Sequence, residues 1–311
     1  MNRAVVFAYH NVGVRCLSVL LAHGVNIACV VTHQDNPDET IWFDSVAALA
    51  ARHGIPVITP DDPNDPAVIA ELAALQADFF FSFYYRLMLK PALLTLPKRG
   101  AYNMHGSLLP KYRGRVPVNW AIIKGEHETG ATLHEMLEKP DAGRIVAQQA
   151  VPILPDDTAA EVFNKVTVAA ELALNNVMPA LLAGQAEHQP QNLTTGSYFG
   201  GRKAEDGRID WTKSAQEIHN LIRAVAPPYP GAFCDLPRGH LRLLRSLHPS
   251  GSIGTTGHPS LQAIHGELFA ECGDGQVLRL VAVEFGGSVL TSPWSAERII
   301  ATFGTSSLLP S

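Results

Sequence analysis

Short apolar runs alternate with amphipathic stretches along the first 150 residues. The stretches between the apolar runs repeat hydrophobic residues at helical spacing and stop at glycines such as Gly24 and Gly54. Continuous apolar strands separated by helices are typical of a parallel sheet covered on both faces. This pattern predicts an α/β fold with a Rossmann-like, mostly parallel sheet, whose ligands bind beyond the carboxyl ends of the strands. The predicted strands are residues 4–7, 26–32, 55–58 and 78–83.

The pattern changes after residue 100. The segment AYNMH (101–105) is a predicted strand that ends in polar residues, and an irregular loop with the sequence SLLPKYRGR follows it. The β-like segment TGATLHEM leads to a DAG turn and then to IVAQQAVPI. A long helix is predicted over residues 158–182, because its apolar periodicity ends at Gly184.

The rest of the chain predicts a second, smaller domain. Residues 185–207 are polar and contain glycine, so they are predicted to form a linker. After a short helical segment, AQEIHNLIRAV, the chain consists of short β-like segments with glycine turns. We therefore expect an N-terminal catalytic domain over residues 1–200 and a small, β-rich, OB-like domain over 201–311, ending in a frayed terminus.

Composition and charge exclude several classes of protein. Hydrophobic residues make up 46% and charged residues 17% of the 311 residues, as in ordinary globular proteins. The net charge of −5 argues against binding to nucleic acid or to an anionic membrane. No segment has about 20 uninterrupted apolar residues, so we expect no membrane insertion. The four cysteines form no C-x-x-C pair, which favours reduced thiols in a cytoplasmic protein and no metal site.

The densest group of polar residues lies around the strand at 101–105. Asn103 and His105 are two residues apart, so on a strand their side chains share a face. Lys111, Arg113 and Arg115 follow in the loop and would suit an anionic ligand, although a solvated basic turn has the same composition.

Other motifs give weaker or negative signals. Asp141 begins the DAG segment, and an aspartate before glycine is common in turns for purely local reasons. The first predicted strand leads into FAYHNVG, which has one glycine where a dinucleotide-binding loop needs three. The P-loop, zinc-protease and serine-hydrolase motifs are missing from the sequence.

Taken together, these segments resemble a known family. AYNMHGSLLPKYRG, with Asp141 following Gly114 by 27 residues, is similar in order and spacing to the folate-dependent formyltransferases. The segments VVFAYHNVG, FSFYYR and IRAVAPPYPGAF further resemble the UDP-4-amino-4-deoxy-L-arabinose formyltransferases of the lipid A aminoarabinose pathway, which is linked to polymyxin resistance. The similarity spans about residues 3–235.

The resemblance implies a co-substrate, roles for three residues and a binding pocket. The donor would be 10-formyltetrahydrofolate, with Asn103 stabilising the oxyanion, His105 acting as general acid and base, and Asp141 raising the pKa of that histidine. No metal is implied. The residues implied to bind the folate are Leu87, Met88, Leu89, Arg115, Leu137, Glu138, Lys139, Pro140 and Asp141. Read alone, Leu87, Met88 and Leu89 could equally be core residues.

The sequence departs from the family in two ways. Pro140 stands where the family usually has a small residue before the aspartate, which could reshape the folate loop. Relatives of the aminoarabinose type often carry a fused decarboxylase domain with a nicotinamide cofactor. We expect neither that activity nor its assembly from these 311 residues, and the oligomeric state is left open.

The acceptor amine is predicted to belong to a UDP-amino sugar. Methionyl-tRNA formyltransferase is the main alternative, since it has the same layout and length, and glycinamide ribonucleotide is a third acceptor. Residues 204–311 contain eight Lys and Arg against ten Asp and Glu, a net charge of −2. A domain that binds tRNA should be basic, although Arg238, Arg242 and Arg245 lie close together and could form a local stripe. Another nucleotide-linked amino sugar also remains possible.

Overall fold

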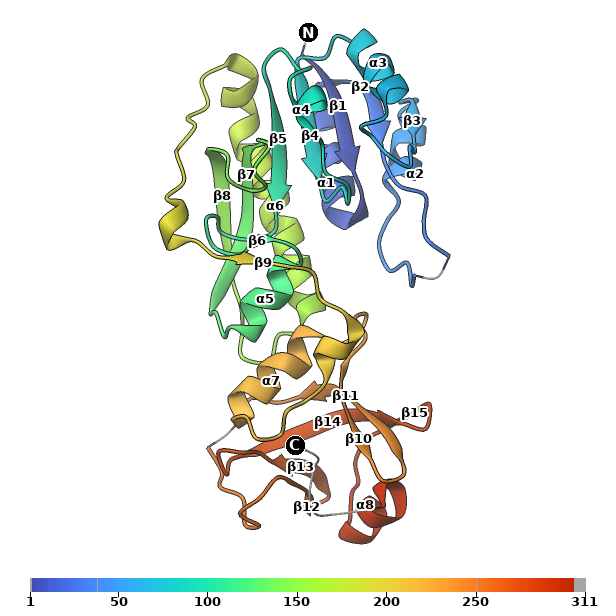
Figure 1. The fold of residues 1–311 in the computed structure, drawn as a ribbon, viewed down its shortest axis with the longest axis vertical. Coiled ribbons are helices and arrows are strands. Elements are labelled where there is room, and N and C mark those ends of the chain that lie inside the picture. Colours follow the sequence, from blue (N-terminus) through green and yellow to red (C-terminus); the bar gives the residue numbers. More distant parts are fainter. Residues whose placement is uncertain (1, 38, 250, 305–311) are drawn as a thin grey trace. The chain divides into compact units, whose positions relative to one another are not determined.

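The chain folds into two compact units, each described separately below. The computed structural model describes residues 2–37, 39–249 and 251–304 (Figure 1). The first unit contains the chain up to Pro117, together with residues 129–151 and 164–200. The second contains residues 118–128 and 152–163 and the described part of the chain from Gly201 onward. The predicted linear boundary after residue 200 stays a prediction.

The first unit is built on the mostly parallel sheet that the sequence predicts. Strand β1 pairs in parallel with β2 and β4, β2 with β3, and β4 with β5, whereas β7 runs antiparallel to β5. Strand order reverses between β1 and β4, which is where a sheet of this kind places a ligand. In spatial order the strands are β3 (Val57–Ile58), β2 (Asn26–Val31), β1 (Arg3–Ala8), β4 (Phe79–Phe83), β5 (Gly100–His105), β7 (Glu128–Glu135) and β8 (Ile145–Pro152).

Both faces of the central strands β1 and β4 are buried, which explains why these strands are continuous apolar runs. On one face, Phe7 of β1 and Phe80 of β4 pack with Leu72 of α3 (Pro66–Ala74) and Leu93 of α4 (Pro91–Leu94). The adjacent residues on the same strands, such as Val6 on β1 and Phe81 on β4, point to the opposite face of the sheet. Their side chains are fully buried as well. The predicted parallel α/β architecture is therefore confirmed.

Helices α1 (His10–Ala22) and α6 (Ala159–Ala183) lie side by side. Arg15 of α1 forms a bidentate ion pair with Glu171 of α6, and both N···O distances are 2.7 Å. By length and composition alone, α6 could cross a membrane. However, Glu171 interrupts its apolar sequence, and the side chains of Val166 and Leu174 are fully buried, as in the core helix of a globular protein.

The predicted linker over residues 185–207 is partly wrong, because this segment contains regular structure. It includes two 3-10 turns, η1 (Leu193–Thr195) and η2 (Ala204–Gly207), and the strand β9 (Tyr198–Phe199). Strand β9 pairs in parallel with β6 (Arg113–Gly114), which belongs to the loop after β5. A two-residue strand leaves no hydrophobic period in the sequence, so pattern analysis could not find it.

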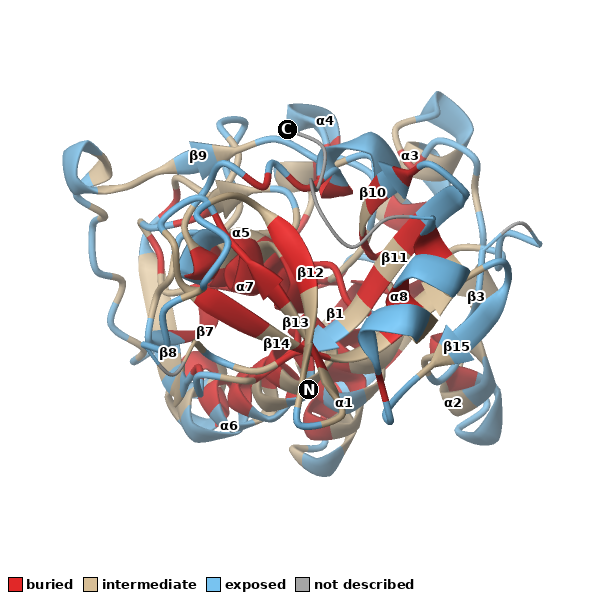
Figure 2. Cartoon of the chain, turned by 90° about the horizontal axis from the view of Figure 1, so that it is seen from below, coloured by how far each residue is buried: buried red, intermediate tan, exposed pale blue. Residues whose placement is uncertain are grey.

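The second unit contains the predicted β-rich domain. Each strand pairing in its sheet is antiparallel. Figure 2 shows the start of β12 as buried, whereas α8 presents an exposed face. The sheet contains β10 (Ala232–Leu236), β11 (Gly239–Ser246), β14 (Val277–Phe285), β13 (Glu267–Glu271) and β12 (Ser260–Ile264), with β15 (Ser288–Leu290) paired to β14.

The helices are placed largely as predicted. Ser45 caps α2 (Val46–Arg52) by accepting a hydrogen bond from the amide of Ala48. In the second unit α7 (Ala215–Ala224) begins with a capping box between Ser214 and Glu217. Helices α4, α5 (Pro117–Ile123) and α8 (Ala296–Phe303) were not predicted. The predicted frayed tail, 301–311, is wrong at its start, because residues 301–303 belong to α8, and residues 305–311 lie outside the described residues.

Candidate active site

Strand β5 presents Asn103 and His105 at its carboxyl end. The two side chains lie on the same face, as their spacing predicts. Strand β4 flanks them on one side, where Ser82 is the partner of Asn103, and β7 on the other, where Thr132 is the partner of His105. The His105 side chain is only 7% exposed, so its protonation depends on a few close neighbours.

The connection between β7 and β8 brings Asp141 to this pair. One carboxylate oxygen, Oδ1, lies 3.5 Å from Nδ1 of His105, and the backbone amide of Gly114 donates a 2.9 Å hydrogen bond to the other, Oδ2. Asp141 has a positive φ of 50°, and Gly143 lies where a Cβ would come within 2.0 Å of the Glu135 carbonyl oxygen. The DAG sequence thus makes the tight turn that aims the carboxylate at His105.

His134 completes the group, and the sequence analysis did not identify it. It lies on β7 directly opposite Asn103, and its Nε2 is 3.2 Å from the Asn103 amide nitrogen and 3.4 Å from Oδ1 of Asp141. Its Nδ1 lies 2.7 Å from the Glu135 carbonyl oxygen and is placed to donate to it. In the neutral ring Nε2 then accepts from Asn103, whereas in the protonated ring Nε2 donates toward Asp141. The one feature of the sequence that pointed to His134 was its place in the β-like segment TGATLHEM. The pairing register of that segment with β5 cannot be predicted from the sequence, so the position of His134 opposite Asn103 was missed.

The protonation states follow from this geometry. Burial favours the neutral acid, but His105, His134 and the Gly114 amide outweigh it and hold the pKa of Asp141 well below its usual range. Burial also lowers the pKa of His105 below that of a free histidine, while the Asp141 carboxylate opposes this shift. At neutral pH the site therefore holds an ionised Asp141 beside a neutral His105 imidazole.

The SLLPKYRG loop fixes the position of His105. The carbonyl oxygen of Tyr112 lies 2.8 Å from Nε2 of His105, and the buried Ser107 hydroxyl donates to the carbonyl of Lys111 at 2.7 Å. Gly114 has a φ of 99°, and a Cβ there would lie 2.2 Å from the Phe199 carbonyl oxygen on β9. Only glycine fits this position, which is why the strand pair β6–β9 can support Asp141.

The residues predicted to bind folate have different surroundings. Leu87 and Met88, just after β4, are 39% and 57% exposed, and Asn64 donates a hydrogen bond to the Met88 carbonyl. Leu89 is instead buried in the core cluster around Leu93. Of the remaining predicted residues, Arg115 and Leu137, Glu138 and Lys139 are exposed, whereas Pro140 and Asp141 are half-buried.

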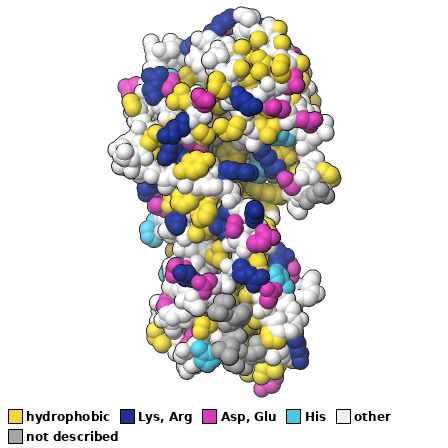
Figure 3. Space-filling view, in the orientation of Figure 1, with side chains coloured by type: hydrophobic (Ala, Val, Ile, Leu, Met, Phe, Trp, Pro, Cys, Tyr) yellow, Lys and Arg dark blue, Asp and Glu magenta, His cyan; other side chains and the backbone are white. Residues whose placement is uncertain are grey.

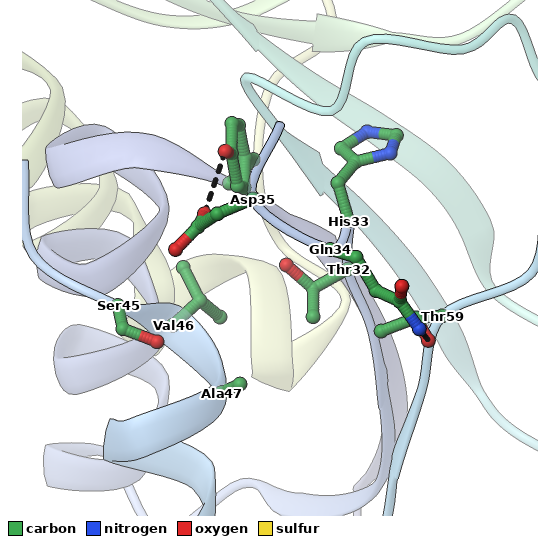
Figure 4. Close-up of a pocket in the computed structure, with 9 residues that line it drawn as sticks. Thr32, His33, Gln34, Asp35, Ser45, Val46, Ala47 and Thr59 are labelled. Atoms are coloured by element: carbon green, nitrogen blue, oxygen red, sulfur yellow. Dashed lines mark hydrogen bonds between the residues drawn. The ribbon is translucent and has the colours of Figure 1, made fainter. Parts of the chain in front are cut away.

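A pocket of about 290 Å³ lies at the carboxyl ends of β1, β2 and β3 (Figure 4). Asp35, Gln34 and Thr59 supply polar groups, and Thr32 and Val46 form part of its wall. The sequence analysis did not single out these residues. Across the described parts of the chain, no group of three or more His, Cys, Asp or Glu side chains is arranged to hold a metal ion.

Comparison with known proteins gives family matches and similar folds. A formyl transferase family model matches residues 14–178, and a formyl transferase C-terminal domain model matches residues 202–294. Similar solved structures include an N-formyltransferase from Helicobacter canadensis in complex with folinic acid and dTDP-3-aminofucose. It is 22% identical over 90% of this chain and 99% of that chain, with a TM-score of 0.71.

Two further solved structures are sugar enzymes. One is WlaRD, a sugar 3N-formyl transferase in the presence of dTDP and 5-N-formyl-THF, at 21% identity, 90% and 97% coverage and a TM-score of 0.70. The other is a sugar N-formyltransferase from a Shewanella species, at 18% identity, 80% and 98% coverage and a TM-score of 0.64. At these identities the likeness establishes a shared fold.

Proposed function

The chain belongs to the formyl transferase family and is a formyltransferase, and we propose that it moves the formyl group of 10-formyltetrahydrofolate to the 4-amino group of UDP-4-amino-4-deoxy-L-arabinose. The observation that carries this proposal is the grouping of Asn103, His105 and Asp141 at the carboxyl end of β5. These three groups supply an oxyanion donor, a base and its stabilising anion.

The reaction begins when the unprotonated amine attacks the formyl carbon of the folate. A new C–N bond forms, and the carbonyl oxygen becomes an oxyanion. The Asn103 amide has two N–H donors, one of which faces His134. The other can stabilise the oxyanion, a contact that is worth about 3 kcal/mol in comparable enzymes.

His105 carries the proton from the attacking amine to the departing folate nitrogen. Since Nε2 donates to the Tyr112 carbonyl, Nδ1 is the basic nitrogen, and it faces Asp141. When Nδ1 takes the amine proton, the carboxylate stabilises the imidazolium. The intermediate then collapses, the bond to N10 of the folate breaks, and His105 returns the proton to N10. The exposed Leu87, Met88, Arg115 and the 137–140 segment are the proposed folate contacts.

Two observations support a sugar nucleotide as the acceptor over tRNA. The similar structures include an N-formyltransferase in complex with dTDP-3-aminofucose, which is an amino sugar linked to a nucleotide. In addition, the candidate basic stripe of the second unit is largely neutralised: Arg242 pairs with Glu284 at 2.8 Å, and Arg245 pairs with Glu161 at 3.3 Å. Basic and acidic side chains are also interspersed on the face seen in Figure 3. A tRNA-binding surface needs unpaired cations in a cluster.

An acceptor panel tests this proposal. Purified protein is incubated with 10-formyltetrahydrofolate and, separately, with UDP-4-amino-4-deoxy-L-arabinose, dTDP-3-aminofucose or methionyl-tRNA. We expect the UDP sugar to be formylated with the highest kcat/KM. Formylation of methionyl-tRNA without formylation of any sugar would refute the assigned acceptor. The proposed setting is the cytoplasm, within lipid A aminoarabinose modification.

A further inference from the structure

The pocket at the carboxyl ends of β1, β2 and β3 contains a carboxylate that can accept hydrogen bonds from the hydroxyl groups of a ligand. The Tyr9 hydroxyl donates a 2.8 Å hydrogen bond to Oδ1 of Asp35, and burial together with this bond raises the pKa of Tyr9 to about 12. Tyr9 therefore stays protonated and holds the carboxylate in place. In Figure 4 the Asp35 carboxylate points toward Ser45 and Val46. Its second oxygen, Oδ2, remains available to accept from a ligand.

The rest of the pocket suits a small ligand that is polar at one end. The Gln34 amide and the Thr59 hydroxyl lie within 3.4 Å of each other on one side, whereas Val46 and Ala47 of α2 give an apolar wall. The volume of about 290 Å³ is at the lower end for small-molecule sites, which fits one nucleoside better than a whole cofactor. In Rossmann-like sheets an acidic residue after the second strand binds ribose hydroxyls, and Asp35 occupies that place after β2.

A series of aromatic contacts leads from this pocket to the active site within the same unit. Tyr9 packs against Phe43 with ring centroids 5.0 Å apart, and Phe43 packs against His10 in a tilted arrangement with centroids 4.0 Å apart. His10 lies 6.4 Å from the ring of Tyr84. The Tyr84 hydroxyl in turn lies 2.0 Å from where a Cβ on Gly106 would be, and Gly106 follows His105 directly. These aromatic side chains therefore lie between the pocket and the strand end that carries His105.

The separation between pocket and site matches the length of a nucleotide sugar. Phe7 is level with Val31 of β2 and with Ser82 of β4, and Ser82 is level with Asn103 of β5. Three strand spacings of about 4.8 Å separate β2 from β5, or about 14 Å. The diphosphate and pyranose ring between a ribose and a 4-amino group comprise about ten bonds, on the order of 12 Å when extended.

We propose that this pocket binds the nucleoside half of the acceptor, with the Asp35 carboxylate accepting hydrogen bonds from the ribose diol. The inference rests on the proposed function, because it assigns a subsite to the same acceptor. It also accounts for a preference between nucleotides, since a ribose offers the carboxylate a 2′-hydroxyl that a deoxyribose lacks. A hydrogen bond to a charged group is worth about tenfold or more in affinity.

The test combines a change in the protein with a change in the ligand. Binding of UDP and of 2′-deoxy-UDP is measured by calorimetry for the wild type, for Asp35→Ala and for Asp44→Ala. Asp44 is an exposed aspartate of the same loop that does not line the pocket, so it is a matched control for charge. We expect the wild type and Asp44→Ala to bind UDP about tenfold more tightly than 2′-deoxy-UDP, and Asp35→Ala to bind both equally weakly.

Kinetics supply the second readout. Asp35→Ala is expected to raise KM for the UDP-amino sugar about tenfold while KM for the folate and kcat stay within about twofold, which also shows that the variant is folded. Equal binding of the two nucleotides by the wild type, or an unchanged UDP affinity in Asp35→Ala, would overturn the inference. A wild type that binds UDP in this way but formylates no sugar nucleotide would contradict the proposed function instead.

Discussion

The Asn103 amide is held by His134, so the two residues should act as a unit. We expect Asn103→Ala and His105→Ala each to lower kcat about a hundredfold or more, because the proposed mechanism uses both groups in the transition state. His134→Ala leaves the amide in place but frees its orientation, and about a tenfold loss is expected. The double variant Asn103→Ala/His134→Ala should be no slower than Asn103→Ala alone.

Single-turnover rates with saturating folate measure these losses. Near-wild-type rates for Asn103→Ala or His105→Ala would remove that residue from the mechanism. Fully additive losses in the double variant would show that His134 acts independently of Asn103.

The charge on Asp141 should set the basicity of His105. The carboxylate opposes the effect of burial, which by itself lowers the histidine pKa. Replacing Asp141 with Asn removes the anion and keeps the size of the side chain, so the pKa of His105 should fall further. NMR titration of the His105 ring protons in both proteins measures the change. An unchanged or higher pKa in Asp141→Asn would contradict the proposed role of the carboxylate.

At the scale of elements, the short strand pair β6–β9 supports the Asp141 carboxylate. Gly114→Ala would force a Cβ against the Phe199 carbonyl oxygen in a backbone conformation that L residues rarely adopt. We expect a loss of about 2 kcal/mol or more in the free energy of unfolding and a lower kcat, because the Gly114 amide also binds Asp141.

Gly200→Ala is the matched control for this change. A Cβ at Gly200 would meet no atom within 4 Å, so stability and kcat should stay close to the wild-type values. Urea denaturation and steady-state kinetics measure both variants. Equal effects of the two substitutions would show that the close contact at Gly114 is not what matters.

Helix α7 contains a buried histidine that should make the second unit sensitive to acid. His219 is fully buried between the Ser246 hydroxyl and the Pro155 carbonyl, and burial lowers its pKa to about 4. In the unfolded chain its pKa is about 6.5, so below that pH the unfolded state binds the extra proton. The stability that depends on a neutral His219 is therefore present above about pH 6.5 and is lost as pH falls toward 4.

Replacing His219 with Gln removes this titration. Between about pH 7 and pH 4.5 the wild type should lose roughly 2–3 kcal/mol more in the free energy of unfolding than His219→Gln. Urea denaturation at the two pH values tests this, with the exposed His53→Gln as a control that should behave as the wild type. An equal loss in wild type and His219→Gln would contradict the assignment.

The sequence predicted the elements whose side chains repeat with a clear period. Strands such as β1 and β4 were found because both of their faces are buried, which requires continuous apolar runs. Asn103 and His105 were found because they are close in sequence at a strand end. His134 and Asp35 were missed because their importance depends on strand pairing and on a loop that returns to Tyr9, and neither leaves a local pattern.

At the scale of the whole molecule, charge bears most directly on the choice of acceptor. The net charge of −5 and the paired arginines of the second unit provide no broad positive surface for RNA. The polar groups that could bind an anionic substrate are instead local, as with the exposed Lys111 and Arg115 beside β5. This local distribution of positive charge suits the binding of two small substrates at the proposed active site.

Transfer of a labelled formyl group tests the central claim most directly. The protein is mixed with 10-formyltetrahydrofolate carrying carbon-13 in the formyl group and with UDP-4-amino-4-deoxy-L-arabinose, and the reaction is followed by NMR. We predict that the label appears in an N-formyl amide on the sugar, in step with release of tetrahydrofolate, and that His105→Ala slows this transfer about a hundredfold or more. Label that stays on the folate, or transfer at the same rate with His105→Ala, would contradict the account.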